Sequence, residues 1–110
     1  MSRDSQQYNN VLIELAKVPA IGKNKGAADR AIVADTVFAQ GSGKPTLMTG
    51  DTHIVSRLFH RFGPGKATPI KQLHGEDVID AITRLYPSGF DADMPDGTGG
   101  TRAIVVIPMT

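Results

Sequence analysis

Residues 103–107 form an uninterrupted apolar run, Ala-Ile-Val-Val-Ile, that is rich in β-branched side chains. A run without polar alternation is typical of a strand buried on both faces, as in parallel sheets. A second short apolar run, at residues 46–49, lies between two segments with helical periodicity, which is the element order of an α/β layer fold. The sequence therefore predicts an α/β fold, with a small, mainly parallel sheet flanked by about four helices.

Four segments place apolar residues at helical spacing and begin or end at capping or helix-breaking residues. We expect helices from about Ser5 to Val18, from Asn24 to Gln40, from Thr52 to Phe62 and from Glu76 to Tyr86. Residues 68–73 fit either a short edge strand or a simple connection. Residues 88–101 are dense in Gly, Asp and Pro and are predicted to be a loop.

Length and composition limit the classes of protein to consider. The 110 residues are 40% hydrophobic, which is sufficient for one domain spanning residues 1–110. The absence of cysteine excludes disulfides, thiolate metal sites and thiol catalysis. No apolar run approaches the roughly 20 residues that span a bilayer. The polar N-terminus predicts no signal peptide, so any secretion signal would lie outside these residues.

The charges are unevenly distributed along the chain. Residues 1–71 contain ten Lys and Arg against five Asp and Glu, whereas residues 72–110 contain two against six. This split gives +5 and −4, which sum to the net charge of +1. A basic half is typical of a face that meets a polyanion such as RNA, although chance clustering on a solvated surface explains it equally well.

Two carboxylates lie at positions where an α/β fold gathers functional groups. Asp51 comes directly after the strand at residues 46–49, and Asp29 lies in the first turns of the second helix. If that helix packs beside the strand, both side chains meet at one mouth of the sheet. Such a pair favours a hard cation, Mg²⁺ or Mn²⁺. Taken singly, Asp29 also fits as a charge that complements the helix dipole, and Asp51 as a helix cap.

A family resemblance strengthens the metal hypothesis. Residues 24–34, Asn-Lys-Gly-Ala-Ala-Asp-Arg-Ala-Ile-Val-Ala, and residues 46–51, Thr-Leu-Met-Thr-Gly-Asp, resemble the second half of a PIN-type nuclease domain. The match is strongest over residues 24–58. PIN domains begin with a strand that ends in an aspartate, and nothing before Tyr8 can form it. The resemblance therefore implies a truncated domain, or one in which the strand at 103–107 takes that position without an acid.

The PIN resemblance also implies an activity and a set of site residues. Members of this family are metal-dependent endoribonucleases with a cluster of acids. By this resemblance Asp29 and Asp51 are catalytic and bind Mg²⁺ or Mn²⁺, Thr49 positions or assists a ligand, and Glu14 supplies the acid of an earlier helix. RNA, with tRNA among the candidates, is the implied substrate.

A second resemblance concerns the biological context. Small cysteine-free domains with a Gly-rich loop and a final strand resemble the C-terminal toxin modules of bacterial polymorphic and contact-dependent inhibition systems. That resemblance implies release from a larger secreted protein and action in the cytoplasm of a target or host cell. It also implies a cognate immunity protein as a partner.

Helix 52–62 offers a different chemistry. His53 and His60 lie seven residues apart on one helical face, with Arg57 between them. Two imidazoles and a guanidinium could cleave RNA without metal, by general acid–base transfer. Arg57, Arg61 and Lys66 are candidates for binding RNA phosphates. A solvated helix surface is the other interpretation of these residues. For the whole chain, the competing class is a non-catalytic interaction module, in which the terminal strand and the acidic half at residues 72–110 dock a partner.

Overall fold

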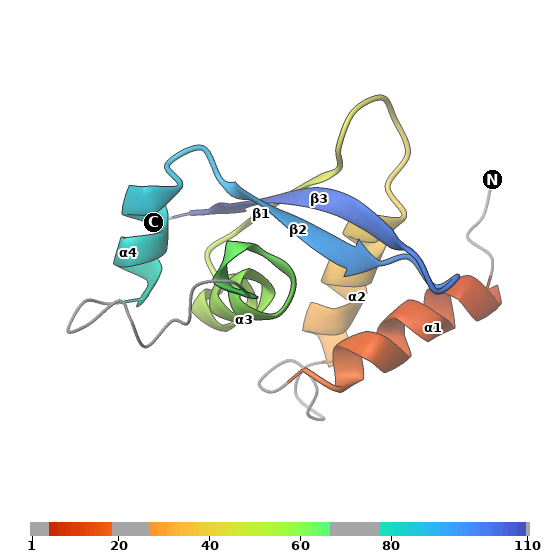
Figure 1. Cartoon of the computed structure of the whole chain (residues 1–110). Helices are drawn as coiled ribbons and strands as arrows, with labels where there is room; N and C mark the ends of the chain where they lie inside the picture. Colours follow the sequence, from red (N-terminus) through yellow and green to blue (C-terminus); the bar gives the residue numbers. More distant parts are fainter. Residues whose placement is uncertain (1–4, 19–26, 67–77, 110) are drawn as a thin grey trace.

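The computed structural model describes residues 5–18, 27–66 and 78–109 (Figure 1). In chain order the elements are α1 (Ser5–Ala16), α2 (Ala27–Val37), β1 (Thr46–Thr49), α3 (Thr52–Phe62), the 3₁₀ turn η2 (Pro64–Lys66), α4 (Val78–Leu85), β2 (Phe90–Pro95) and β3 (Thr101–Pro108). All four predicted helices are present. Parts of the expected second and fourth helices, and all of residues 68–73, lie outside the described residues.

The three strands form one sheet in the order β1-β3-β2. β1 is parallel to β3, with Leu47 opposite Val106, and β2 is antiparallel to β3, with Ala92 opposite Ile104. The α/β class is thus confirmed, whereas the sheet is mixed rather than mainly parallel. The difference arises because residues 90–95, which were expected to be a loop, form the antiparallel strand.

β2 has the alternating pattern of a half-buried strand. Phe90, Ala92 and Met94 are buried against the helices, while Asp91 and Asp93 are exposed on the opposite face. An antiparallel edge strand needs apolar residues on one face only, so aspartates at every second position are compatible with it. The loop prediction was wrong because Gly, Pro and Asp content outweighed this alternation.

The helices lie on one side of the sheet, with α1, α2 and α3 beneath it and α4 beside α3 (Figure 1). On β3, Ile104 and Val106 point to the helices and are fully buried. Val105 and Ile107 lie on the outer face and are only partly covered. The expected burial on both faces therefore holds for the inner face alone.

The core fills the space between the sheet and the helices. α3 supplies much of it, and Phe59 packs edge-on against Phe90 and Tyr86, with ring centroids 5.2 and 5.7 Å apart. Arg102 fastens β3 to the end of α2 by donating a hydrogen bond from Nη1 to the carbonyl of Val37 at 2.6 Å. α3 packs against the inner face of the sheet through this apolar side, and its N-terminus comes directly after β1.

Candidate functional site

The junction of β1 and α3 is fixed by short hydrogen bonds around Asp51. The carboxylate oxygen Oδ1 accepts from the main-chain N–H groups of His53 at 2.9 Å and Ile54 at 3.1 Å, so Asp51 is the N-cap of α3. The main-chain N–H of Asp51 donates to the hydroxyl of Thr49 at 3.1 Å. Oδ2 makes no hydrogen bond with a described residue, and the side chain is 38% exposed. Asp51 is therefore rigidly oriented, with one oxygen available.

Asp29 lies in the first turn of α2, where a negative charge is favourable beside the unpaired N–H groups. The residue is partly buried. Its carboxylate forms no hydrogen bond or ion pair with the described part of the chain. Asp29 and Asp51 thus both lie at the N-terminus of a helix, and each has a carboxylate oxygen without a partner among the described residues.

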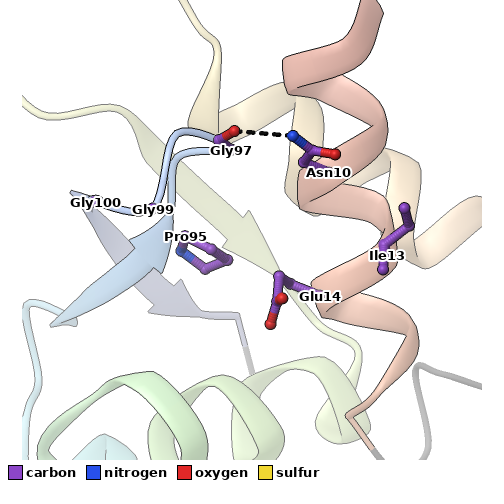
Figure 2. Close-up of a pocket in the computed structure, with 7 residues that line it drawn as sticks. All are labelled: Asn10, Ile13, Glu14, Pro95, Gly97, Gly99 and Gly100. Carbon is purple, nitrogen blue, oxygen red and sulfur yellow. Dashed lines mark hydrogen bonds between the residues drawn. The ribbon is translucent and has the colours of Figure 1, made fainter.

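Glu14 lies on α1, at the edge of a cavity of about 440 Å³ between that helix and the β2–β3 hairpin (Figure 2). It is exposed and forms an ion pair with Lys17 at 3.2 Å. The described residues contain no group of three or more His, Asp and Glu side chains that could hold a metal. Glu14, Asp29 and Asp51 therefore do not form the three-ligand cluster that the PIN resemblance implied.

The hairpin that closes this cavity is attached to α1 by two side-chain amides. Gln7 donates to the carbonyl of Asp96 at 2.8 Å, and Asn10 donates to the carbonyl of Gly97 at 3.0 Å (Figure 2). The Asp96 carboxylate accepts two hydrogen bonds from Thr98, one from its hydroxyl and one from its main-chain N–H. These bonds, the hydroxyl bond most, lower the pKa of Asp96. The glycines at positions 97, 99 and 100 indicate a tight hairpin, but nothing in the sequence indicates the cavity beside it.

The face of α3 that points away from the apolar core carries His53, Arg57 and His60. His53 is 73% exposed, whereas Arg57 and His60 are each partly buried. Two of their nitrogen atoms, Arg57 Nε and His60 Nδ1, are buried and have no hydrogen-bond partner in the described structure. Polar atoms that are buried without a partner are rare in folded proteins, so these two nitrogens are an unusual feature of the helix.

Spacing along α3 decides which of these side chains can act together. Residues three apart on a helix have Cβ atoms about 5–6 Å apart, so Arg57 and His60 are neighbours. His53 and His60 are two turns apart, about 10.5 Å along the axis at 1.5 Å per residue. Arg57 and His60 can thus contact one small anion together. His53 and His60, which were predicted as a pair, lie on the same face but farther apart than Arg57 and His60.

Two further basic side chains extend this surface. Arg61 lies in the last turn of α3 and Lys66 ends η2, and both are exposed. Arg57, His60, Arg61 and Lys66 are called the α3 basic surface below.

No known protein family, curated protein or solved structure matches this chain. Within the described ranges, no helix has the length and apolar character needed to cross a membrane.

Proposed function

We propose that the chain is an endoribonuclease and that the RNA backbone lies on the α3 basic surface. The observation that carries this proposal is the set of four basic side chains on one short segment, of which Arg61 and Lys66 are exposed and Arg57 and His60 are partly exposed. Arg57 Nε always carries a proton, and His60 Nδ1 carries one in the imidazolium form or the matching tautomer.

A phosphodiester is the anion that fits this pair best. Its two non-bridging oxygens can accept from two neighbouring donors at once, and hydrogen bonds from ionised donors are stronger than neutral ones. Arg61 and Lys66 continue the positive charge toward the next phosphates of a strand. The resemblance of residues 24–58 to PIN-type ribonucleases supports RNA as the nucleic acid.

For the cleavage step we propose a divalent cation, Mg²⁺ or Mn²⁺, held by Asp29 and Asp51. The residues fit such an ion in kind, because both offer a carboxylate oxygen that no described residue engages. Mg²⁺ commonly takes one or two protein carboxylates and completes its shell with water and substrate phosphate. Such an ion would supply an activated water and offset charge on the phosphate. Thr49 contributes by fixing the orientation of Asp51.

His60 favours a second candidate, metal-free cleavage, because it is partly exposed and lies next to Arg57 on α3. In this mechanism the ribose 2′-hydroxyl loses its proton to a base and attacks the adjacent phosphorus. The bond to the 5′-oxygen breaks, that oxygen gains a proton, and a 2′,3′-cyclic phosphate remains. His60 would transfer one proton while Arg57 stabilises the phosphorane charge. His53, two turns away on the same face, or a water molecule would transfer the other proton.

The test is cleavage of labelled single-stranded RNA and tRNA by the purified chain, read on denaturing gels. With a metal mechanism, EDTA abolishes cleavage, added Mg²⁺ or Mn²⁺ restores it, and the new ends carry a 5′-phosphate. Asp29→Asn and Asp51→Asn each lower the rate by about 100-fold or more, since a lost transition-state contact of about 2.7 kcal/mol corresponds to that factor. Asn also caps helices well, so Asp51→Asn leaves the fold intact.

The same assay separates the alternatives. Metal-free cleavage would persist in EDTA, produce cyclic phosphates and disappear in His60→Gln. Arg57→Gln should weaken RNA binding under either mechanism, whereas Lys44→Gln, which removes an ion pair with Asp91 at the sheet, should not. A chain that cleaves none of these RNAs and binds them equally well with Arg57→Gln is not the proposed nuclease, and a docking module would then explain the surface.

The toxin-module resemblance adds a proposal on context. We propose that the domain acts on RNA in the cytoplasm of a target cell and is blocked by a cognate immunity protein. Expression in bacterial cells should then arrest growth, and Asp51→Asn should relieve the arrest if the metal mechanism holds. Growth equal to that of an empty-vector control, with the wild-type domain present at comparable levels, would contradict this context.

A further inference from the structure

The cavity between α1 and the β2–β3 hairpin has the size of a small-molecule site. Its volume of about 440 Å³ lies within the range of about 300–1,000 Å³ that is common for ligand pockets. The seven described residues that line it are labelled in Figure 2, and none of the seven is basic. Neither of the two cleavage mechanisms proposed above uses this cavity or its carboxylate, Glu14.

Two carboxylates lie at this cavity, and the first is Glu14. Its side chain extends from α1 toward Pro95 (Figure 2), and its Oε1 accepts a hydrogen bond from Lys17 Nζ at 3.2 Å. Both side chains of this ion pair are more than half exposed, and exposed pairs of this kind contribute little to stability. Oε2 makes no hydrogen bond with a described residue. Glu14 can therefore accept hydrogen bonds from a ligand.

The second carboxylate, Asp96, lies between the lining residues Pro95 and Gly97. Its Oδ2 is 3.2 Å from the position that a Cβ would take at Gly100, another lining residue. Hydrogen bonds from the hydroxyl and the main-chain N–H of Thr98 lower the pKa of Asp96, so this carboxylate is ionised at neutral pH. Glu14 and Asp96 together outweigh the single charge of Lys17, which leaves the cavity with a net negative charge.

The same cavity also has apolar surface. The Pro95 ring faces Glu14 across it (Figure 2), and Ile13, which is 55% exposed, lines it as well. The three lining glycines of the hairpin have no side chains, so main-chain atoms form that part of the wall. A ligand in the cavity would therefore meet apolar surface along its body and carboxylate oxygen at one end.

From this combination we infer that the cavity binds an organic cation, which carries a guanidinium, amidinium or ammonium group on an apolar stem. A planar guanidinium or amidinium donates two parallel hydrogen bonds to one carboxylate, and such charge-assisted bonds are roughly twice as strong as neutral ones. Glu14 accepts these bonds, and the stem packs against Pro95 and Ile13. A bare inorganic cation would gain nothing from the two apolar side chains. The inference does not rest on the proposed nuclease function.

Benzamidine is a suitable probe, because it carries an amidinium group on a flat apolar ring. Titrated into the ¹⁵N-labelled full chain, it should shift the amide signals of Gly97, Gly99 and Gly100. Binding should saturate with a Kd of about 1 mM, as expected for a ligand of so few atoms. Benzamide has nearly the same shape without the charge, and it should bind at least tenfold more weakly. Equal binding of the two compounds, or shifts that avoid the hairpin, would overturn the inference.

Two substitutions that change the net charge equally test whether Glu14 holds the probe. Glu14→Gln keeps the shape of the side chain and removes its charge, so it should weaken benzamidine binding at least tenfold. Asp93→Asn is the matched control, because Asp93 is exposed on the outer face of the sheet, and it should leave the Kd unchanged within about twofold. A similar loss in both variants would mean that net charge alone attracts benzamidine, and it would contradict a site at Glu14.

A guanidinium group on an apolar stem has two possible sources, a free small molecule and an arginine side chain of another protein. Agmatine represents the first source and the peptide acetyl-Ala-Arg-Ala-amide the second, and the same amide signals report both titrations. Tighter binding of agmatine would assign the cavity to a free alkylguanidine. Tighter binding of the peptide would assign it to an arginine of a protein partner. Glu14→Gln should weaken either ligand at least tenfold.

Discussion

At the scale of single residues, Gly97 determines how closely the β2–β3 hairpin approaches α1. It has a positive φ of 85°, and a Cβ built there would overlap the main-chain oxygen of Gln7. Gly99 has a similar φ of 94° but no atom within 4 Å of its Cβ position. The two glycines therefore share a left-handed backbone conformation and differ in crowding.

Gly97→Ala should consequently lower the free energy of unfolding more than Gly99→Ala does. The left-handed backbone costs an alanine about 1–2 kcal/mol at either position, and the displaced α1 contact adds about 1–3 kcal/mol at Gly97 alone. Urea denaturation followed by circular dichroism measures both losses. Equal losses would mean that the hairpin does not rest on α1 as described.

Residue roles were only partly predictable from the sequence. Asp51 was expected as a cap or as a metal ligand, and the structure confirms the cap, because that role depends on local geometry. The buried nitrogens of Arg57 and His60 were not predictable, since periodicity puts both residues opposite the apolar stripe. Burial on that side depends on which other segments pack there, and this information is not in the helix itself.

At the scale of elements, α3 depends on its cap. Asp51→Ala removes the acceptor for two N–H groups at the start of the helix and should lower the free energy of unfolding by about 1 kcal/mol. Asp51→Asn keeps an acceptor and should change stability by much less. Chemical denaturation of the wild type, Asp51→Ala and Asp51→Asn measures these free energies of unfolding. If Asp51→Asn is nearly as stable as the wild type, its loss of cleavage reflects chemistry and not unfolding. If Asp51→Asn is destabilised as much as Asp51→Ala, its loss of cleavage could not be assigned to chemistry.

Helices were more predictable than the sheet for a physical reason. An apolar stripe specifies a helix from neighbouring residues alone, and the α3 bounds matched the expected Thr52–Phe62. The partner and direction of a strand depend on residues distant in sequence. β3 was expected from its apolar run. Its antiparallel partner at residues 90–95 was not expected, because the Gly, Asp and Pro content of this region is typical of a loop.

At the scale of the whole molecule, exposed aspartates of β2 and exposed basic residues of α3 and η2 lie on different sides of the sheet. Asp91 and Asp93 are exposed on the outer face of the sheet, while Arg61 and Lys66 are exposed on the helical side. The sequence predicted a basic face, and the fold places these basic residues on α3 and η2. Lys44 lies by contrast at the sheet, paired with Asp91 at 2.8 Å.

This arrangement predicts how RNA binding depends on salt. Each phosphate contact with a single strand releases counterions and contributes about −0.7 to the slope of log K against log salt concentration. Contacts from Arg57, Arg61 and Lys66 therefore predict a slope of about −2. Fluorescence anisotropy with labelled RNA and the Asp51→Asn variant measures binding without the proposed metal-dependent cleavage.

Single substitutions in the Asp51→Asn variant then test which basic residues contribute to this salt dependence. Arg61→Gln and Lys66→Gln should each reduce its magnitude by about 0.7, because each removes one phosphate contact. Lys44→Gln changes the net charge equally and should leave the slope unchanged, because its ammonium group is already paired at the sheet. If Lys44→Gln reduced the slope as much as the other two, net charge alone would attract the RNA, and the α3 basic surface would have no specific role.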